Sequence, residues 1–142
     1  MKPTSLRTSI LSIFLIGFVA SAFAQTSPES LNEKRERRRN MTVREYNSDA
    51  KGKSRWMDHV TVYNAKGLKI EEIEYATYGM RERIVFEYDA NELCTKEIVY
   101  DEKNKVSRIR KYVYNSDGTK KTQYNYLPNG RLYSTKVYQY SN

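Results

Sequence analysis

Side chains able to catalyse a reaction or to bind a metal are scarce in this 142-residue chain. It contains one histidine, His59, and one cysteine, Cys94. A serine or cysteine nucleophile would need His59 as its base, and no nucleophile motif surrounds that residue. Zinc sites need several Cys and His ligands at set spacings, so two such residues do not make a typical one. The sequence therefore predicts no catalytic residue, no metal site and no cofactor.

The carboxylates that stand close together are best explained by turns. Asp89, Glu92, Asp101 and Glu102 follow recurring tyrosines, where Asp stabilises a turn through its own backbone. Paired acids of this kind can also hydrolyse a bond or hold calcium, but turn formation explains them without a site. No glycine-rich phosphate loop is present. Cys94 has no cysteine partner within the chain, which leaves open a disulfide to another molecule. We expect a protein that is not an enzyme.

A recurring tyrosine organises most of the chain. The steps between successive members are 17, 12, 13, 12, 14, 12 and 14 residues. The members are Tyr46, Tyr63, Tyr75, Tyr88, Tyr100, Tyr114, Tyr126 and Tyr140. A step of this size fits one strand of seven to nine residues and a tight turn. Because antiparallel strands reverse direction, the repeating unit is a hairpin of about 25 residues.

Turn residues follow most of these tyrosines. Asn115-Ser116-Asp117-Gly118 and Leu127-Pro128-Asn129-Gly130 fit a type I turn closed by a glycine with positive φ. The predicted fold is all-β: an antiparallel β-meander of seven or eight strands over residues 41–142, forming a single curled sheet. Its last strand would be an exposed edge.

Tyr63-Asn64-Ala65-Lys66-Gly67-Leu68-Lys69, the 115–118 turn and Asn129-Gly130-Arg131-Leu132 resemble known bacterial repeats. They are similar to the tyrosine–aspartate (YD) repeats of Rhs-type cell-surface proteins and to the MORN-like repeats of envelope proteins. The turns after Tyr88 and Tyr100 depart from this pattern because they lack glycine. The resemblance implies a β-hairpin repeat domain of the bacterial cell envelope. It implies no particular ligand.

The N-terminus is typical of a secretory signal peptide over residues 1–24. Lys2 and Arg7 precede an apolar run at 10–19, and Ala22-Phe23-Ala24 is a small-x-small cleavage site. The sequence predicts cleavage after Ala24 and a secreted or periplasmic protein without a membrane span. An uncleaved anchor is the alternative, which the shortness of the apolar run disfavours. Removing two cations would lower the net charge from +8 to +6.

Residues 25–40 have few apolar side chains and no strand periodicity. We interpret them as a flexible or frayed-helical charged leader. Its arginines, Arg35, Arg37, Arg38 and Arg39, could bind nucleic acid or anionic lipid, but a solvated tail is favoured because glutamates partly offset them. An export signal argues further against a nucleic-acid partner.

Aromatic and basic side chains suggest where a ligand would bind. If all hairpins kept one parity, a tyrosine surface with interleaved cations would cover one face of the sheet. Structural packing explains most of the tyrosines. The candidate ligand-binding residues are Tyr112, Tyr124, Tyr138, Arg110 and Lys136. We expect an exported binding module that engages a polysaccharide, a peptide or an envelope protein. The alternative is a structural protein that assembles through its sheet edges, which leaves an oligomer open.

Overall fold

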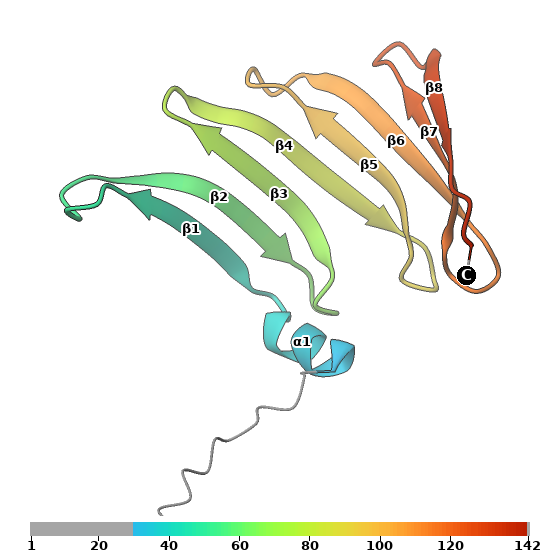
Figure 1. Cartoon of the computed structure of the whole chain (residues 1–142), viewed down its shortest axis with the longest axis horizontal. Helices are drawn as coiled ribbons and strands as arrows, with labels where there is room; N and C mark the ends of the chain where they lie inside the picture. The colour runs from blue at the N-terminus through green and yellow to red at the C-terminus, as the bar shows by residue number, and fades with distance from the viewer. Residues whose placement is uncertain (1–29, 142) are drawn as a thin grey trace, which may run out of the picture.

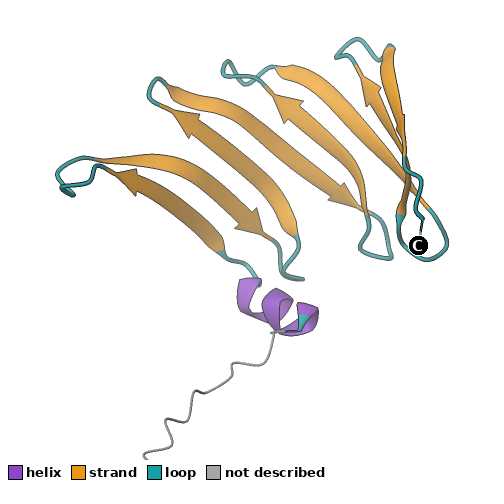
Figure 2. Ribbon diagram, in the orientation of Figure 1, coloured by secondary structure: helices purple, strands orange, loops and turns teal. Residues whose placement is uncertain are grey.

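The computed structural model describes residues 30–141 and contains one eight-stranded antiparallel sheet and one short helix (Figure 1). In chain order the elements are α1 (Leu31–Arg38), β1 (Thr42–Ser48), β2 (Arg55–Tyr63), β3 (Lys69–Ala76), β4 (Gly79–Tyr88), β5 (Cys94–Tyr100), β6 (Val106–Tyr114), β7 (Lys120–Tyr126) and β8 (Leu132–Val137). Each strand pairs with its neighbours in sequence, and the sheet does not close. Apart from α1, the described chain is strand and turn (Figure 2). The predicted all-β meander is confirmed.

A β-bulge recurs in every hairpin, and it explains the curl of the sheet. In each hairpin the second strand carries one extra residue within its turn-proximal half: Asp58, Ile70, Arg81, Thr95, Ser107, Lys121 and Tyr133. A bulge bends its strand and increases the local twist. One bulge in each hairpin therefore curls the sheet, and β7 and β8 turn away from the plane of the first strands (Figure 1). Gly118 and Gly130 have φ of 83° and 82°, as the turn sequences predict.

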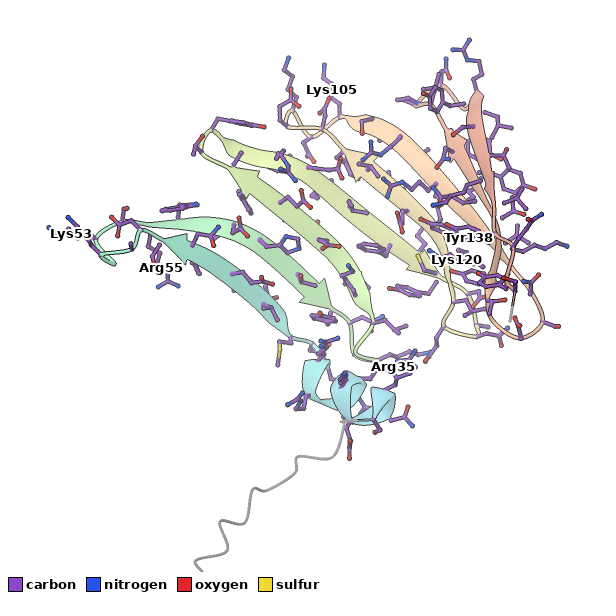
Figure 3. The ribbon with its side chains drawn as sticks, in the orientation of Figure 1. Arg35, Lys53, Arg55, Lys105, Lys120 and Tyr138 are labelled. Carbon is purple, nitrogen blue, oxygen red and sulfur yellow. The ribbon has the colours of Figure 1, made fainter. Side chains whose placement is uncertain are left out.

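The two faces of the sheet follow from the strand register, because directly opposed residues point to the same side. Glu97 is opposite Phe86 and Arg110, and Arg110 is opposite Asn125. We call this side the inner face, because the sheet curls toward it. Tyr138 and Lys120 lie on this face (Figure 3). The other side, the outer face, carries an apolar row from β4 to β8: Val85, Ile98, Ile109, Tyr126 and Leu132.

The expected single aromatic face is wrong. Tyr112 is opposite Gln123 and Tyr124 is opposite Lys111, so Tyr112 lies on the inner face and Tyr124 on the outer face. The turn and the bulge of this hairpin together place an even-numbered residue of β6 opposite an odd-numbered residue of β7. A tyrosine of β6 and a tyrosine of β7 that are separated by an even number of residues therefore lie on opposite faces.

Little of the sheet is buried, since no second layer covers it in residues 30–141. The buried hydrophobic side chains of this part of the chain are Val60, Leu68, Val99 and Tyr112. Polar side-chain contacts lie on the inner face instead. Between neighbouring strands, His59 contacts Glu72, Arg81 pairs with Glu74 and Arg110 pairs with Glu97. Lys69 pairs with Glu72 within β3, and Arg108 of β6 pairs with Glu82 of β4, across β5. Pairs of this kind contribute about 0.2–1 kcal/mol each where they are exposed.

Three of the recurring tyrosines make the same hydrogen bond. The hydroxyls of Tyr88, Tyr114 and Tyr140 donate to the backbone carbonyls of Lys69, Cys94 and Lys120 at 2.6, 2.6 and 2.8 Å. Each acceptor stands just after the previous turn on the same edge of the sheet. These side chains tie successive hairpins together, which is a structural reason for the recurrence.

We expect the domain to lose stability between pH 10 and pH 12. Burial raises the pKa of Tyr88 and Tyr114 from 10.0 to about 12. A pKa that is higher in the folded state means that the folded protein holds the proton more tightly, so this contribution is complete below pH 10 and is lost as the pH rises through 12. Urea unfolding at several pH values measures it. Tyr114→Phe should reduce the loss, whereas Tyr78→Phe in an exposed turn should leave it unchanged.

Helix α1 is attached to the turn edge of the sheet. Ser30 and Glu33 form a capping box at its start. Arg35 forms an ion pair with Glu92 at 2.6 Å, and the guanidinium of Arg38 lies 5.2 Å from the centre of the Tyr63 ring. The leader arginines are thus engaged within the protein: Arg39 pairs with Glu36, also at 2.6 Å.

Part of the N-terminal prediction cannot be compared with the structure. The predicted signal peptide, residues 1–24, and the first residues of the leader lie outside the described range. Between residues 30 and 141 no helix has the length and apolar character needed to cross a membrane.

Candidate functional site

A groove on the inner face of β6, β7 and β8 is the best candidate site. Its volume is 370 Å³. The lining residues are Ser107, Arg108, Arg110, Gln123, Asn125, Tyr126, Leu127, Tyr133 and Ser134. Two guanidinium groups and two amides thus meet beside Tyr133, whereas the Tyr126 ring lies on the outer face, where the Lys111 amine is 5.3 Å from its centre. Planar polar groups beside an aromatic ring suit a ligand that has both hydroxyl groups and an apolar face.

Hydrogen bonds hold the amides of the groove floor in position. Gln123 Nε2 donates to Asn125 Oδ1 at 2.7 Å, and Asn125 Nδ2 donates to Ser134 Oγ at 2.9 Å. The Tyr138 hydroxyl donates to Gln123 Oε1 at 3.0 Å. The floor is therefore a connected network across β7 and β8 that reaches Tyr138. A ligand would meet amides whose orientation is already fixed, which lowers the entropy cost of binding.

The charge around the groove is positive. Arg110 pairs with Glu97 at 2.6 Å, and this carboxylate keeps the pKa of Arg110 raised although burial lowers it. Arg108 pairs with Glu82 at 2.7 Å. Residues 118–142, by contrast, contain no Asp or Glu and carry Lys120, Lys121, Arg131 and Lys136. The C-terminal hairpin therefore attracts anionic groups.

Four of the five sequence-predicted candidates lie on the inner face. Arg110 lines the groove, and Tyr138 and Lys136 lie next to it, with the Lys136 amine 5.2 Å from the centre of the Tyr138 ring. Tyr112 is on the same face but only 8% exposed, with the Lys120 amine 4.0 Å from its ring centre. Tyr124 is separated from the others because it lies on the outer face, opposite Thr135.

Tyr133 is the aromatic residue that the sequence analysis missed. It is 74% exposed and lines the groove together with Arg110 and Ser134. Strict alternation would place Tyr133 on the face opposite to Ser134. Tyr133 is the extra residue of the β7–β8 bulge, where alternation fails. The only sequence signal is its place two residues after the Asn129-Gly130-Arg131 turn, where four other hairpins also have their bulge.

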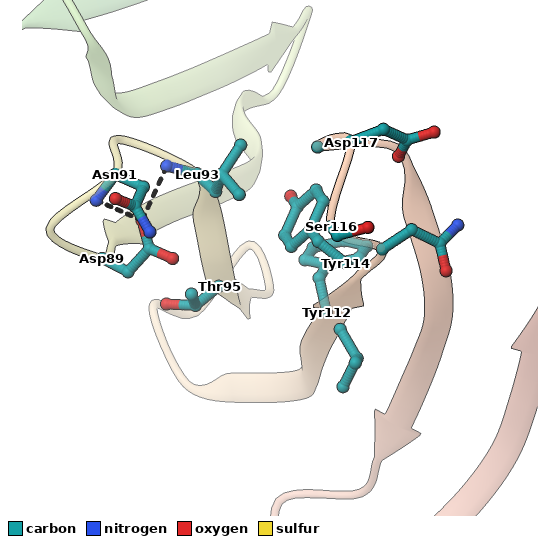
Figure 4. A pocket seen from close by; sticks show the side chains of 11 residues that line it. Asp89, Asn91, Leu93, Thr95, Tyr112, Tyr114, Ser116 and Asp117 are labelled. Atoms are coloured by element: carbon teal, nitrogen blue, oxygen red, sulfur yellow. Dashed lines mark hydrogen bonds between the residues drawn. The ribbon is translucent and has the colours of Figure 1, made fainter.

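A second, larger hollow lies between two turns and is less suited to a ligand. Its volume is 740 Å³, and it separates the 89–93 turn from the 115–118 turn (Figure 4). Its acidic groups already serve their own turns: Asp89 Oδ1 accepts from the backbone N–H groups of Asn91 and Leu93, and Asp117 Oδ1 accepts from that of Thr119. In residues 30–141 no cluster of His, Cys, Asp and Glu is arranged to hold a metal ion.

Known proteins give little guidance on this site. No protein-family model matches the chain, and no curated protein matches it. A solved structure that matches in part is a point mutant of Staphylococcus aureus TarM in complex with fondaparinux, alpha-GlcNAc-glycerol and UDP. The match has a TM-score of 0.28 and 17% identity, and it covers 72% of this chain and 20% of the other. This likeness is too weak to support an argument about fold or function.

Proposed function

We propose that the protein is an exported, non-enzymatic binding module of the bacterial cell envelope, whose inner face binds a polysaccharide. The observation that supports this best is the groove of β6–β8, where exposed Tyr133 stands beside Arg108, Arg110 and a fixed amide floor. A tyrosine ring stacks on the apolar face of a sugar, and planar amides and guanidinium groups bond its hydroxyls. Among the partners that the sequence suggests, a sugar polymer uses most of these groups.

The N-terminal sequence and the charge agree with this proposal. The basic start, the apolar run at 10–19 and the Ala22-Phe23-Ala24 cleavage site together are typical of an export signal, which would release a mature chain starting at Gln25 outside the cytoplasm. The resemblance to YD and MORN-like repeats supports an envelope location. A hairpin with four cations and no carboxylate favours a polymer that carries acidic groups.

We expect the mature domain to bind polygalacturonate, an acidic polysaccharide, more tightly than neutral dextran in affinity electrophoresis. Tyr133→Ala and Lys136→Gln should each weaken binding at least tenfold, which corresponds to about 1.4 kcal/mol. Both residues are exposed, so the melting temperature should remain almost unchanged.

Two matched variants serve as controls. Tyr78→Ala removes a tyrosine that is 70% exposed in the β3–β4 turn, and Lys111→Gln removes a cation from the outer face. Neither should change the affinity. If Lys111→Gln weakened binding as much as Lys136→Gln, the attraction would be a general charge effect and not a property of the groove. Absence of binding to either polymer would count against a polysaccharide ligand.

A further inference from the structure

The outer edge of β8 has backbone groups without partners in the described chain. All six of its residues are exposed. Beyond its end, the Tyr138 N–H donates to the Lys121 carbonyl of β7 at 3.1 Å. Backbone groups of an antiparallel strand alternate in direction, so those of Lys136 also point toward β7. Those of Thr135 and Val137 therefore point away from the sheet, and Gln139 follows in the same alternation.

We propose that a second copy of this chain pairs with this edge, β8 against β8 in antiparallel orientation, with the two-fold axis beside Val137. In this register Val137 is opposite Val137 of the second copy, and Thr135 is opposite its Gln139. Each opposed pair exchanges two hydrogen bonds, which gives about six across the interface. All three outward-pointing residues of each strand then find partners.

Charge and packing select this register over its neighbours. An axis beside Lys136 would set two lysines directly opposite each other, which is unfavourable. An axis beside Thr135 would use Tyr133, whose backbone lies in the bulge. With the axis beside Val137, Lys136 stands opposite Tyr138 of the second copy. Lys136 already lies 5.2 Å from the ring of its own Tyr138, so its amine would lie between two aromatic rings.

The other edge of the sheet fits a strand partner less well. β1 carries Arg44 and Glu45 in adjacent positions, and helix α1 precedes it directly. Pairing of β8 with β1 of another copy would also leave a free edge at each end and build a ring or a fibre, whereas a β8–β8 pair closes after two copies. The closed pair uses one patch on both copies, as two-fold symmetry requires.

The dimer would enlarge the candidate site, so this inference also deepens the proposed function. A two-fold axis perpendicular to the sheet keeps both inner faces on the same side. Lys136 and Tyr138 of both copies would then form one continuous floor between the two grooves. A long polymer could bind both grooves at once, which raises its apparent affinity.

Analytical ultracentrifugation of the mature protein over a wide concentration series tests the proposal. We expect a monomer–dimer equilibrium. Val137→Lys should raise the dimer dissociation constant at least tenfold, because it sets two cations opposite each other at the axis. Val137 is 65% exposed, so the monomer should fold normally. Thr135→Pro is a second variant, which removes an outward N–H and leaves the β7 bonds intact.

Val113→Lys is the matched control. Val113 is 43% exposed and lies in the same outer-face row as Thr122 and Val137. It belongs to β6, which has a neighbouring strand on both sides and therefore no free edge. This variant should dimerise like the unmodified protein. Loss of the dimer in Val113→Lys would indicate stacking of outer faces and would overturn the proposal. A strictly monomeric protein, or species larger than a dimer, would overturn it as well. Polysaccharide binding by Val137→Lys with lower affinity would leave the proposed function standing.

Discussion

Replacing Gly67 with alanine should destabilise the domain by about 3 kcal/mol, compared with about 1 kcal/mol for the same replacement at Gly118. The two glycines occupy equivalent turns. The N–H of Gly67 donates to the Asn64 carbonyl at 2.9 Å, and that of Gly118 to the Asn115 carbonyl at 3.0 Å. Their φ values are 71° and 83°, so alanine pays the same left-handed backbone cost in both places.

The difference arises from helix α1. A Cβ at Gly67 would overlap the backbone of Arg35, whereas one at Gly118 would have no atom within 4 Å. The helix would have to move away, and this movement would weaken the ion pair of Arg35 with Glu92 and the stacking of Arg38 on Tyr63. Overpacking of this kind costs about 1–3 kcal/mol beyond the backbone strain.

Urea unfolding of both variants measures these costs. Deletion of residues 30–39 provides the control, because without α1 the two alanine variants should be equally stable relative to the shortened parent. Equal destabilisation in the full mature domain would show that α1 does not pack on Gly67 in solution, and this outcome would contradict the fold described here.

The meander could be predicted from local signals. Tyrosines at steps of 12 to 14 residues and Asn, Asp and Gly in the turns specify strand length and reversal without reference to distant residues. A sheet that pairs only sequence neighbours contains little else to predict. The attachment of α1 could not be predicted in this way. It depends on Gly67 being small and on Glu92 standing in the next turn of the same edge, and this proximity appears only after the sheet is assembled.

The candidate site could be predicted only in part, because one bulge per hairpin breaks the alternation on which the prediction relied. Arg110, Lys136 and Tyr138 were placed on one face correctly. Away from the turns, even-numbered residues of β6 are opposite odd-numbered residues of β7, and these are opposite even-numbered residues of β8, so two shifts cancel. Tyr124 was misplaced because only one such shift separates β7 from β6, which puts the even-numbered Tyr124 on the other face. Tyr133 was missed because a bulge residue does not follow the period of its strand. Register is a property of the turn and bulge together, and alternation alone does not determine it.

Tyr112→Ala should destabilise the domain by about 3–5 kcal/mol, the cost of removing a buried aromatic ring. Tyr112 is among the few buried hydrophobic residues of the described chain. Its ring supports the Lys120 amine, and burial together with nearby Glu97 raises the pKa of its hydroxyl. No second layer covers the sheet in residues 30–141, so no other side chain of this part of the chain can fill the space left by the ring. The cavity would open to water.

Tyr133→Ala provides the contrast that separates packing from binding. Its ring is 74% exposed, so truncation should change the free energy of unfolding by less than about 0.5 kcal/mol. Chemical unfolding of both variants, with polygalacturonate binding measured on the folded fraction, gives two independent values for each residue. We expect Tyr112→Ala to change stability and Tyr133→Ala to change affinity. Two outcomes would show that the groove was assigned to the wrong tyrosine: unfolding of the domain by Tyr133→Ala, or loss of affinity in Tyr112→Ala at unchanged stability. In either case, exposure would not distinguish the ring that a ligand contacts from the ring that stabilises the sheet.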